Sequence, residues 1–465
     1  MNHSPFAIQN SPFKRYAKYK DSGVEWLGEV PEHWEVPQIK RTTYLKARVG
    51  WKGLTSEEFQ DQAYAYLVTG RDFREKFVKW DECYQVERER YEDDPFIQLQ
   101  NGDLLITKDG TIGKLAIVSD LDHPACLNSG IFVIRPRNSY STEFMYWILS
   151  SNVFSVFCDL ESFGSTINHL YQNVFERFAF PAPPLPEQTA IAAFLDRETA
   201  KIDALVQEQR RLIELLKEKR QAVISAAVTK GIVNSEFGMK NELLSTPTQS
   251  TFATHNSKCI PSGIEWLGDV PEHWEVVKLK FLCDIQTGDK DTENAVDDGL
   301  YPFFVRSQTI ERINSISFDC EAILTAGDGA GVGKVFHYHQ GPFDFHQRVY
   351  MMNNFRHVNG PFLFHYFREQ FYKVALEGGA KSTVDSLRRP MLTNFPVCVP
   401  PEFEQEAIVA SVKVEAEKFD TLTAEANRAI DLLQERRTAL ISAAVTGQID
   451  VRQPIKRNYH DSTHG

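Results

Sequence analysis

The chain has 465 residues, of which 42% are hydrophobic and 25% charged, and its formal net charge is −12. This length predicts two or three domains with substantial cores, and no apolar run reaches the roughly 18–20 residues that a membrane-spanning helix needs. The acidic balance argues against a protein that wraps nucleic acid through bulk positive charge, so DNA contacts would require local basic patches or a basic partner.

The cellular compartment is indicated by the cysteines and by the N-terminus. The seven cysteines are scattered and form no Cys-x-x-Cys pair, which is typical of a reducing cytosol and not of a disulfide frame or a zinc site. The first twenty residues contain no apolar signal segment. We therefore expect a cytoplasmic protein that binds no metal and no membrane.

A repeated aromatic element opens each half of the chain. Residues Val24–Val36 return almost unchanged as Ile264–Val276, at a shift of 240 residues, and both copies contain Trp-Leu-Gly followed by Pro-Glu-His-Trp. Paired Trp rings with Gly and Pro favour a compact turn anchored by large apolar side chains. A binding loop is the alternative, but we interpret the element as a clamp that seats each following domain. Because His33 and His273 are isolated, we do not expect them to bind metal.

Two unlike segments follow these elements. Residues 37–182 and 277–399 differ strongly in sequence, and their short apolar runs predict mixed α/β domains. In the first segment, the strand-like runs Leu104–Thr107 and Leu115–Val118 flank the turn Asp109–Gly113. The corresponding turn of the second half lies within a glycine-rich stretch that ends at Lys334.

This glycine-rich stretch resembles a phosphate-binding loop but does not satisfy its pattern. Asp328 stands where the first Gly of the motif is required, and Val335 stands where Ser or Thr must follow the Lys. A nucleotide-dependent enzyme is therefore not supported. A turn that exposes backbone N–H groups beside a Lys can still approach a DNA phosphate, so a simple turn and a DNA-contacting turn both remain open. The candidate contacts in the two turns are Lys108, Thr111, Lys114 and Lys334.

A polar segment precedes each of the two long helices predicted below. Residues 164–170 and 380–389 are rich in Ser, Thr, Asn and basic side chains, which suit hydrogen bonding to DNA and would equally suit helix capping. The basic cluster favours DNA in the second copy. The candidate contacts are Ser165, Thr166, Lys381, Ser382, Thr383, Arg388 and Arg389.

Two long helices are predicted at residues 186–230 and at the places shifted by 217 residues. Apolar residues recur at spacings of three, four or seven, and neither stretch is interrupted by an internal Pro or Gly. Two matched helices in one chain favour an antiparallel two-stranded coiled coil, and two unrelated surface helices are the alternative. The predicted interface comprises Ile191, Leu195, Ile202, Leu205, Leu212, Leu216, Ile408, Val412, Phe419, Leu422, Leu433 and Leu440.

These features resemble those of the specificity subunit of type I restriction–modification systems. The resemblance extends from about Tyr19 to about Val451 and depends on three motifs. They are the repeated Trp-Leu-Gly element, Pro-Pro-Leu-Pro-Glu-Gln before the first helix, and Lys-Ser-Thr-Val-Asp-Ser-Leu-Arg-Arg-Pro before the second.

The resemblance implies a fold of mixed α/β target-recognition domains with two long helices as an antiparallel coiled coil and an internal pseudo-twofold repeat. The expected parts are an N-terminal tail (1–18), the first recognition domain (19–182), a central helical region (183–232), a linker (233–258), the second recognition domain (259–399), a C-terminal helical region (400–449) and a tail (450–465).

The resemblance also implies a non-catalytic DNA-specificity function. Each recognition domain reads one half of a bipartite double-stranded DNA target, and the paired helices set the spacer. The implied partners are two modification subunits, which use S-adenosylmethionine, and up to two restriction subunits, which use ATP and Mg²⁺. No methyltransferase, helicase or triad motif is found in the chain itself, so no cofactor is expected on it. A type IIB-like specificity component and a coiled-coil protein-interaction scaffold remain alternatives.

Overall fold

The computed structural model describes residues 13–48, 54–137, 139–161, 169–232, 258–377 and 386–452. The chain divides into two compact units, one formed by residues 1–209 with 428–465 and the other by residues 210–427. Within the described residues, no helix is both long and apolar enough to cross a membrane.

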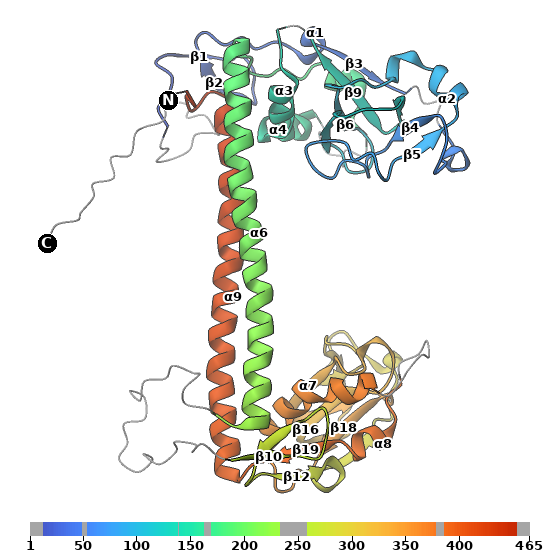
Figure 1. Ribbon diagram of the computed structural model, residues 1–465, viewed down its shortest axis with the longest axis vertical. Helices are drawn as coiled ribbons and strands as arrows, with labels where there is room; N and C mark the ends of the chain where they lie inside the picture. Colours follow the sequence, from blue (N-terminus) through green and yellow to red (C-terminus); the bar gives the residue numbers. More distant parts are fainter. Residues whose placement is uncertain are drawn as a thin grey trace, which may run out of the picture. The chain divides into compact units, whose positions relative to one another are not determined.

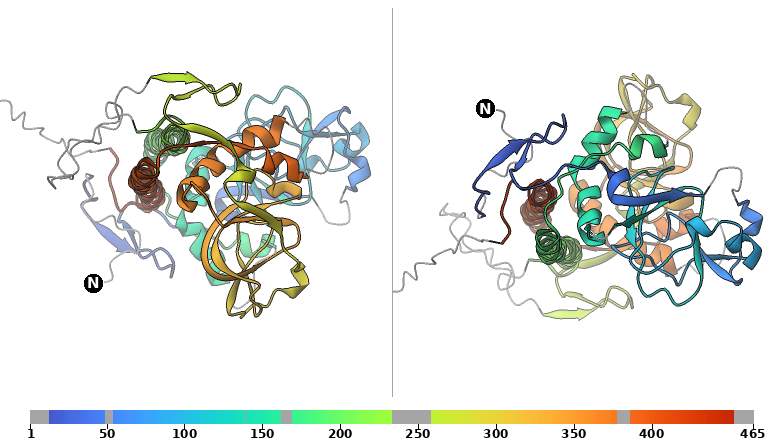
Figure 2. Two further views of the ribbon diagram at one scale, coloured as in Figure 1. Left: turned by 90° about the horizontal axis from the view of Figure 1, so that it is seen from below. Right: turned by 90° about the horizontal axis from the view of Figure 1, so that it is seen from above.

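Two long helices contribute to both units. They are α6 (Leu185–Lys230) and α9 (Glu402–Val445), and they pack side by side in Figure 1 and in both end-on views of Figure 2. α6 begins after consecutive prolines and ends at Gly231, and α9 ends two residues before Gly447, with φ of +82° and +71° at the two glycines. A glycine in this left-handed conformation commonly follows a helix, because other residues are strained there.

The buried positions on the two helices alternate at spacings of three and four residues. The same alternation appears on both helices at a shift of 217. These buried or half-buried positions are Leu195, Thr199, Ile202, Val206, Gln209, Ile213, Leu216 and Arg220 on α6, and Val412, Ala416, Phe419, Thr423, Ala426, Ile430, Leu433 and Arg437 on α9.

Three predicted members of the helix interface are exposed. Leu205, Leu212 and Leu422 are 52%, 42% and 46% exposed, so their assignment to a buried interface is wrong. Val206 and Ile213 are buried in place of Leu205 and Leu212. One residue along a helix is a rotation of about 100°, so neighbouring apolar residues define two different stripes, and only one of them faces inward.

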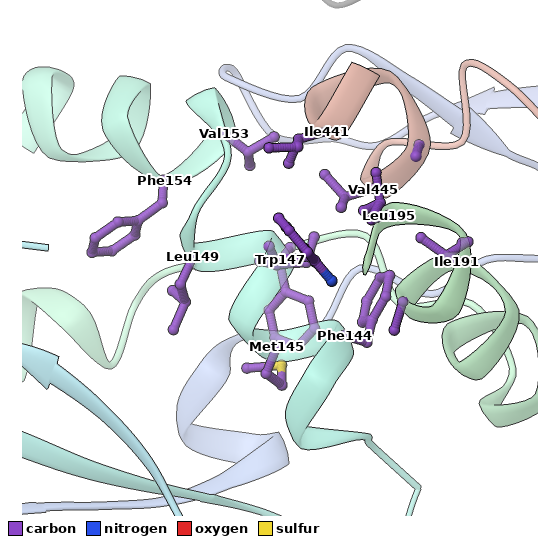
Figure 3. Close-up of a cluster of buried hydrophobic side chains, with 14 of the residues drawn as sticks. Phe144, Met145, Trp147, Leu149, Val153, Phe154, Ile191, Leu195, Ile441 and Val445 are labelled. Atoms are coloured by element: carbon purple, nitrogen blue, oxygen red, sulfur yellow. The ribbon is translucent and has the colours of Figure 1, made fainter. Parts of the chain in front are cut away.

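One of the two buried apolar clusters of the first unit lies where short helices meet α6 and α9. Figure 3 shows side chains from α3 (Thr142–Leu149) and α4 (Asn152–Glu161) lying beside Leu195 of α6 and Ile441 of α9. These residues belong to one buried apolar cluster. The cluster joins the first variable domain to both helices in this unit.

The first unit contains two larger sheets beside the β1-β2 pair. One is four-stranded and antiparallel, in the order β3-β9-β6-β7, and the other is three-stranded, in the order β5-β4-β8. The elements are β1 (Tyr19–Asp21), β2 (Glu29–Pro31), α1 (Ile39–Thr42), β3 (Thr43–Ala47), η2 (Ser56–Glu58), β4 (Ala65–Val68), β5 (Tyr84–Val86), α2 (Arg88–Glu92), η3 (Pro95–Ile97), β6 (Leu104–Thr107), β7 (Leu115–Ile117), β8 (Ala125–Leu127), β9 (Ile131–Pro136) and α5 (Gln172–Phe175).

The second unit contains a six-stranded sheet in the order β13-β18-β16-β17-β14-β15 and a two-stranded sheet, β12-β19. The elements are β10 (Cys259–Pro261), β11 (Asp269–Pro271), β12 (Glu275–Lys278), η4 (Leu279–Phe281), β13 (Asp284–Thr287), η5 (Thr292–Asn294), β14 (Tyr301–Phe304), β15 (Glu311–Ile313), β16 (Phe318–Ala326), η6 (Gly329–Gly331), β17 (Phe336–Phe345), β18 (Val349–Asn353), α7 (Gly360–Glu377), α8 (Arg389–Thr393) and β19 (Pro396–Val399).

The two variable domains share a strand order despite their different sequences. The order β3-β9-β6-β7 in the first unit corresponds to β13-β18-β16-β17 in the second. β17 is long enough to pair with both β16 and β14, whereas separate short strands, β7 and β8, occur in the first unit. The prediction of mixed α/β domains is confirmed, and the divergent segments are built to one topology.

The repeated aromatic element forms the same hairpin in both units. β1 pairs with β2 and β10 pairs with β11, with Tyr19 opposite Pro31 and Cys259 opposite Pro271. At each hairpin a His and a Trp bind one glutamate near the start of a long helix.

In the first unit, that glutamate is Glu187. Trp34 Nε1 donates to its Oε2 (3.1 Å), and His33 Nε2 lies 2.8 Å from its Oε1. The Tyr16 hydroxyl also donates to Oε2 (3.1 Å), and Arg452 Nη1 lies 2.8 Å from Oε1.

In the second unit, Glu404 stands at the equivalent position. Trp274 Nε1 donates to its Oε2 (2.9 Å), and His273 Nε2 lies 2.7 Å from its Oε1. A carboxylate withdrawn from water needs such donors, so the prediction that the element is a clamp is supported at both sites.

Each hairpin also touches the end of the other long helix. A Cβ added to Gly447, after α9, would lie 2.4 Å from Pro31 Cγ and 3.1 Å from Trp34 Cη2. A Cβ added to Gly231, after α6, would lie 3.4 Å from Trp274 Cζ2. One hairpin therefore fixes the beginning of one helix and the end of its partner within each unit.

The glutamine after each glutamate ties the helix to its variable domain. Gln188 accepts from the Ser141 backbone N–H (2.9 Å) just before α3, and Gln405 accepts from the Asn359 backbone N–H (2.8 Å) just before α7. Adjacent Glu and Gln thus hold two separate segments against the start of each long helix.

We expect Glu187→Ala to lower the free energy of unfolding more than Glu404→Ala. The losses should be about 3 and about 2 kcal/mol, because four donors lose their acceptor at Glu187 and two at Glu404. Urea unfolding of the two variants measures both values. Glu208→Ala, an exposed change on α6, is the control and should stay within about 0.5 kcal/mol of the parent. Equal stability of all three variants would contradict the clamp.

Candidate functional site

The turn between β6 and β7 is held by its own hydrogen bonds. The Thr107 hydroxyl donates to the Thr111 carbonyl (2.5 Å) and accepts from the Lys114 backbone N–H (3.0 Å). Gly110 and Gly113 have φ of +67° and +86°, which glycine adopts without strain. The glycine spacing is therefore a requirement of the turn.

This turn lies beside the segment that precedes α5 and α6. The backbones of Asp109 and His169 form an isolated antiparallel β-bridge, and the Leu170 backbone N–H donates to the Lys108 carbonyl (2.8 Å). The imidazole of His169 also contacts the Asp109 carboxylate. Two candidate segments far apart in the sequence are thus neighbours.

The second unit repeats this arrangement. The backbones of Asp328 and Ser386 form an isolated antiparallel β-bridge, and the Leu387 backbone N–H donates to the Gly327 carbonyl (2.8 Å). Because both units pair the turn with the same segment, the juxtaposition belongs to the shared topology.

The charged groups at the second turn differ from those at the first. Arg306 Nη1 and Arg348 Nη1 each lie 2.9 Å from a carboxylate oxygen of Asp328. Burial alone raises the pKa of this carboxyl, but the hydrogen bonds and positive charges of the two arginines outweigh it and hold the pKa below its usual value. The arginine side chains remain 42% and 59% exposed, so both can also contact a ligand.

The predicted turn residues occupy different environments. Thr111, Lys114 and Lys334 are exposed. The Lys108 side chain is only 13% exposed, and its Nζ lies 5.5 Å from the centre of the Phe132 ring. Lys108 is therefore largely engaged within its own unit.

The remaining candidates lie before the helices. Arg388 and Arg389 are both exposed, and Arg389 Nη2 also donates to the Ile285 carbonyl (3.0 Å) of β13. Five candidates lie outside the described residues, namely Ser165, Thr166, Lys381, Ser382 and Thr383.

Sequence reasoning missed His169, Arg306 and Arg348. His169 stands within a polar segment already singled out, so its position was an available signal. The two arginines are 22 and 20 residues from Asp328, and only the sheet brings them together. Across the described ranges, no group of three His, Cys, Asp or Glu side chains is placed to hold a metal ion.

Comparison with known proteins gives one consistent family. A sequence model described as the type I restriction modification DNA specificity domain matches residues 53–215 and 271–430, more than half of the chain.

Among curated relatives, the MjaVIII type I restriction enzyme specificity subunit of Methanocaldococcus jannaschii is 24% identical over 455 residues, covering 91% of this chain and 94% of the relative. The EcoDI specificity subunit of Escherichia coli is 31% identical over 189 residues, covering 39% of this chain and 40% of the relative.

Two solved structures share the fold. A chain from a structure of type I restriction–modification complex assembly has a TM-score of 0.65 at 16% identity, covering 90% of this chain and 99% of that one. The HsdS subunit of Thermoanaerobacter tengcongensis has a TM-score of 0.50 at 14% identity, covering 90% of this chain and 98% of that one.

Proposed function

We propose, because the chain belongs to the type I restriction modification DNA specificity family, that it is the specificity subunit of such a system and reads a bipartite DNA target. The observation that carries the proposal is the repeated pairing of a turn with the pre-helix segment in two domains of one strand order. The same backbone arrangement presents different side chains in the two copies. Two such surfaces suit two unlike half-sites.

The polar groups at these surfaces suit contacts to DNA. Backbone N–H groups in a glycine turn, with exposed Lys114 in one unit and Lys334, Arg306 and Arg348 in the other, provide donors for phosphates and base edges. We infer that Lys108 acts mainly by supporting its turn.

The helices form an antiparallel coiled coil in this proposal. Alternate spacings of three and four give the period of 3.5 residues that characterises a two-stranded coil. Asp203 of α6 and Arg437 of α9 form an ion pair (2.9 Å). Their equivalents at the shift of 217, Asp420 of α9 and Arg220 of α6, also form an ion pair (3.6 Å). Equivalent pairs at exchanged positions support a pseudo-twofold repeat.

Exposed leucines on the helices are proposed to dock the modification subunits. Leu205 and Leu432 in the first unit correspond, at the shift of 217, to Leu422 and Leu215 in the second, and all four are 46–59% exposed. Equivalent apolar positions in both units favour two copies of one partner. Up to two restriction subunits would join that complex.

The chemistry is assigned to these partners. We propose that the chain is non-catalytic and binds no cofactor, while S-adenosylmethionine and ATP with Mg²⁺ act on the modification and restriction subunits. The complex would work in the cytoplasm. A net charge of −12 favours shared enclosure of the DNA with these subunits over binding by this chain alone.

A methylation map tests the central proposal and distinguishes its alternatives. Adenine-methylation mapping of cells that express this chain with its modification subunit should reveal one target with two unlike half-sites and a fixed spacer. A target methylated and cut by a fused methyltransferase–nuclease would instead indicate the type IIB-like alternative. Absence of any new methylated target would support the protein-interaction scaffold.

The same map tests the helices as a ruler. Duplicating seven residues before Arg211 in α6 and seven before Arg428 in α9 adds roughly 10 Å to the pair. At 3.4 Å per base pair, the spacer should lengthen by about three base pairs while both half-sites stay unchanged. Seven residues added within 233–258 are the control and should leave the spacer unaltered. An unaltered spacer in the helix variant would disprove the ruler.

We expect Lys114→Ala and Lys108→Ala to separate DNA contact from support of the turn. Loss of one phosphate contact by Lys114 should reduce the slope of log affinity against log salt by about 0.9 for all DNA sequences. Lys108→Ala should lower the free energy of unfolding by about 1 kcal/mol, because its packing on Phe132 is lost. Filter binding and urea unfolding measure these effects, and the reverse result would exchange the two assignments.

The leucine pairs should each bind one modification subunit. Leu205→Asp with Leu432→Asp should remove one copy from the complex, because a charge replaces buried apolar contact, and the four-site variant including Leu215→Asp and Leu422→Asp should remove both. Native mass spectrometry counts the copies. Ala204→Asp, an exposed neighbouring change, is the control. Two retained copies in the four-site variant would exclude this docking surface.

A further inference from the structure

A basic cavity of about 390 Å³ lies in the second unit where α6, the glycine turn and α7 meet. Four cationic side chains and a single acidic one contribute to its wall. The lining residues are Lys217, Arg220, Gln221, Gly333, Lys334, Phe336, Arg368, Glu369 and Tyr372.

The glycine turn is seated against α7 by close packing. Gly333 has φ of +69°, and an added Cβ would lie 3.3 Å from Ala375 Cβ and 3.8 Å from Tyr372 Cα. This contact fixes the position of the following residue, Lys334. The lysine of the candidate DNA-contacting turn therefore lines a cavity that also includes side chains of the long helix.

The cations of the cavity are incompletely neutralised by the described residues. Lys334 forms no ion pair with them, and Lys217 pairs only with Glu214, where both side chains are more than 60% exposed. Arg220 Nε is buried without a hydrogen-bond partner, and the nearest ion-pair oxygen, on Asp420, is 3.6 Å away. A buried donor without a partner favours binding of an acceptor.

The acidic group in the wall is already engaged. Glu369 Oε1 accepts from Arg368 Nε (3.2 Å). Burial raises the pKa of Glu369, more strongly than the neighbouring Arg368 and Arg220 lower it. This carboxyl contacts Arg368 and no other cation of the wall among the described residues, so the remaining cations are available to an anionic ligand.

The matching cavity of the first unit is nearly balanced, with four cationic side chains against three acidic ones. It has a volume of about 760 Å³ and includes three acidic residues, Glu75, Asp196 and Asp203. Asp196 pairs with Lys76 and Asp203 with Arg437 (2.9 Å).

Residue substitutions between the repeats explain this difference. Gln434 stands at the place equivalent to Lys217. Ser141 and Asn359 occupy equivalent positions, because the backbone N–H of each binds the helix glutamine of its own unit. At the same shift in sequence, Ser150 and Ser151 are the equivalents of Arg368 and Glu369. A large excess of positive charge in this cavity is therefore particular to the second unit.

We propose that this cavity binds a phosphate of the DNA backbone beside the half-site read by the second recognition domain. The inference rests on the proposed DNA-specificity function. Lys and Arg side chains from three elements converge there, as phosphate recognition requires. The contact reads no base, so it adds affinity and fixes the position of the duplex against the frame.

The test is Lys217→Gln, which introduces the residue that the first unit has at this place. In the complex with the modification subunits, the slope of log affinity against log salt should fall by about 0.9, so the ratio of parent to variant affinity should shrink about 3.5-fold between 50 and 200 mM salt. The mapped half-sites should not change. Lys219→Gln is the control, because Lys219 is exposed but does not line the cavity. Equal salt slopes for Lys217→Gln and Lys219→Gln would overturn the proposal.

A second measurement identifies the source of the phosphate. Inorganic phosphate at constant ionic strength should compete with DNA for the parent complex more than for Lys217→Gln. If phosphate instead raises the melting temperature of the parent alone while the variant keeps the parental salt slope for DNA, the cavity takes a free oxyanion and the DNA proposal is wrong. Failure of the parent complex to prefer any DNA target would refute the proposed function itself, independently of Lys217.

Discussion

The structure depends on a glutamate at the start of each long helix that accepts hydrogen bonds from the indole and imidazole of one hairpin. Glu187 and Glu404 are each about nine-tenths buried as side chains, and without these donors the cost of their burial would be uncompensated. The same Trp residues lie against the glycine that ends the other helix. One hairpin therefore fixes where a helix begins and where its partner ends, and the glutamine beside the glutamate attaches the variable domain at the same place.

The hairpins and the long helices could largely be predicted, because their motifs occur twice in the sequence. Equivalent motifs at fixed shifts identify the hairpins and helices without reference to long-range contacts, and the strand Leu104–Thr107 follows from its apolar run. The inward stripe of the helices was not fully predictable. Leu205 and Val206 are both apolar, and spacings of three and four both fit a helix, so only the partner helix decides which of them is buried.

The candidate site was less predictable, because it depends more on contacts between distant segments than on local sequence patterns. Glycines with a neighbouring lysine mark each turn locally, and a polar segment before each helix is visible in the sequence. Their adjacency, and the approach of Arg306 and Arg348 to Asp328, result from strand pairing between distant segments. The environment of Lys108 likewise depends on Phe132 from another strand. Residue type alone could not separate a supporting lysine from a contacting one.

The two units share the contacts between hairpin and long helices, and they differ in the residues where the variable domain meets those helices. Both units have the same glutamate and glutamine at the start of the long helix and the same exchanged Asp–Arg pair. They differ at the cavity, where Gln434, Ser150 and Ser151 are the first unit's equivalents of Lys217, Arg368 and Glu369. Divergence therefore continues beyond the sheets into α7 and into α6, where Lys217 is one of the differing positions. Since α7 both carries Arg368 and is held by Gln405, a recognition domain and its frame contact are joined in one element. In a chain of net charge −12, the proposed phosphate cavity thus gathers four cationic side chains beside a single acidic one where that element meets the long helix.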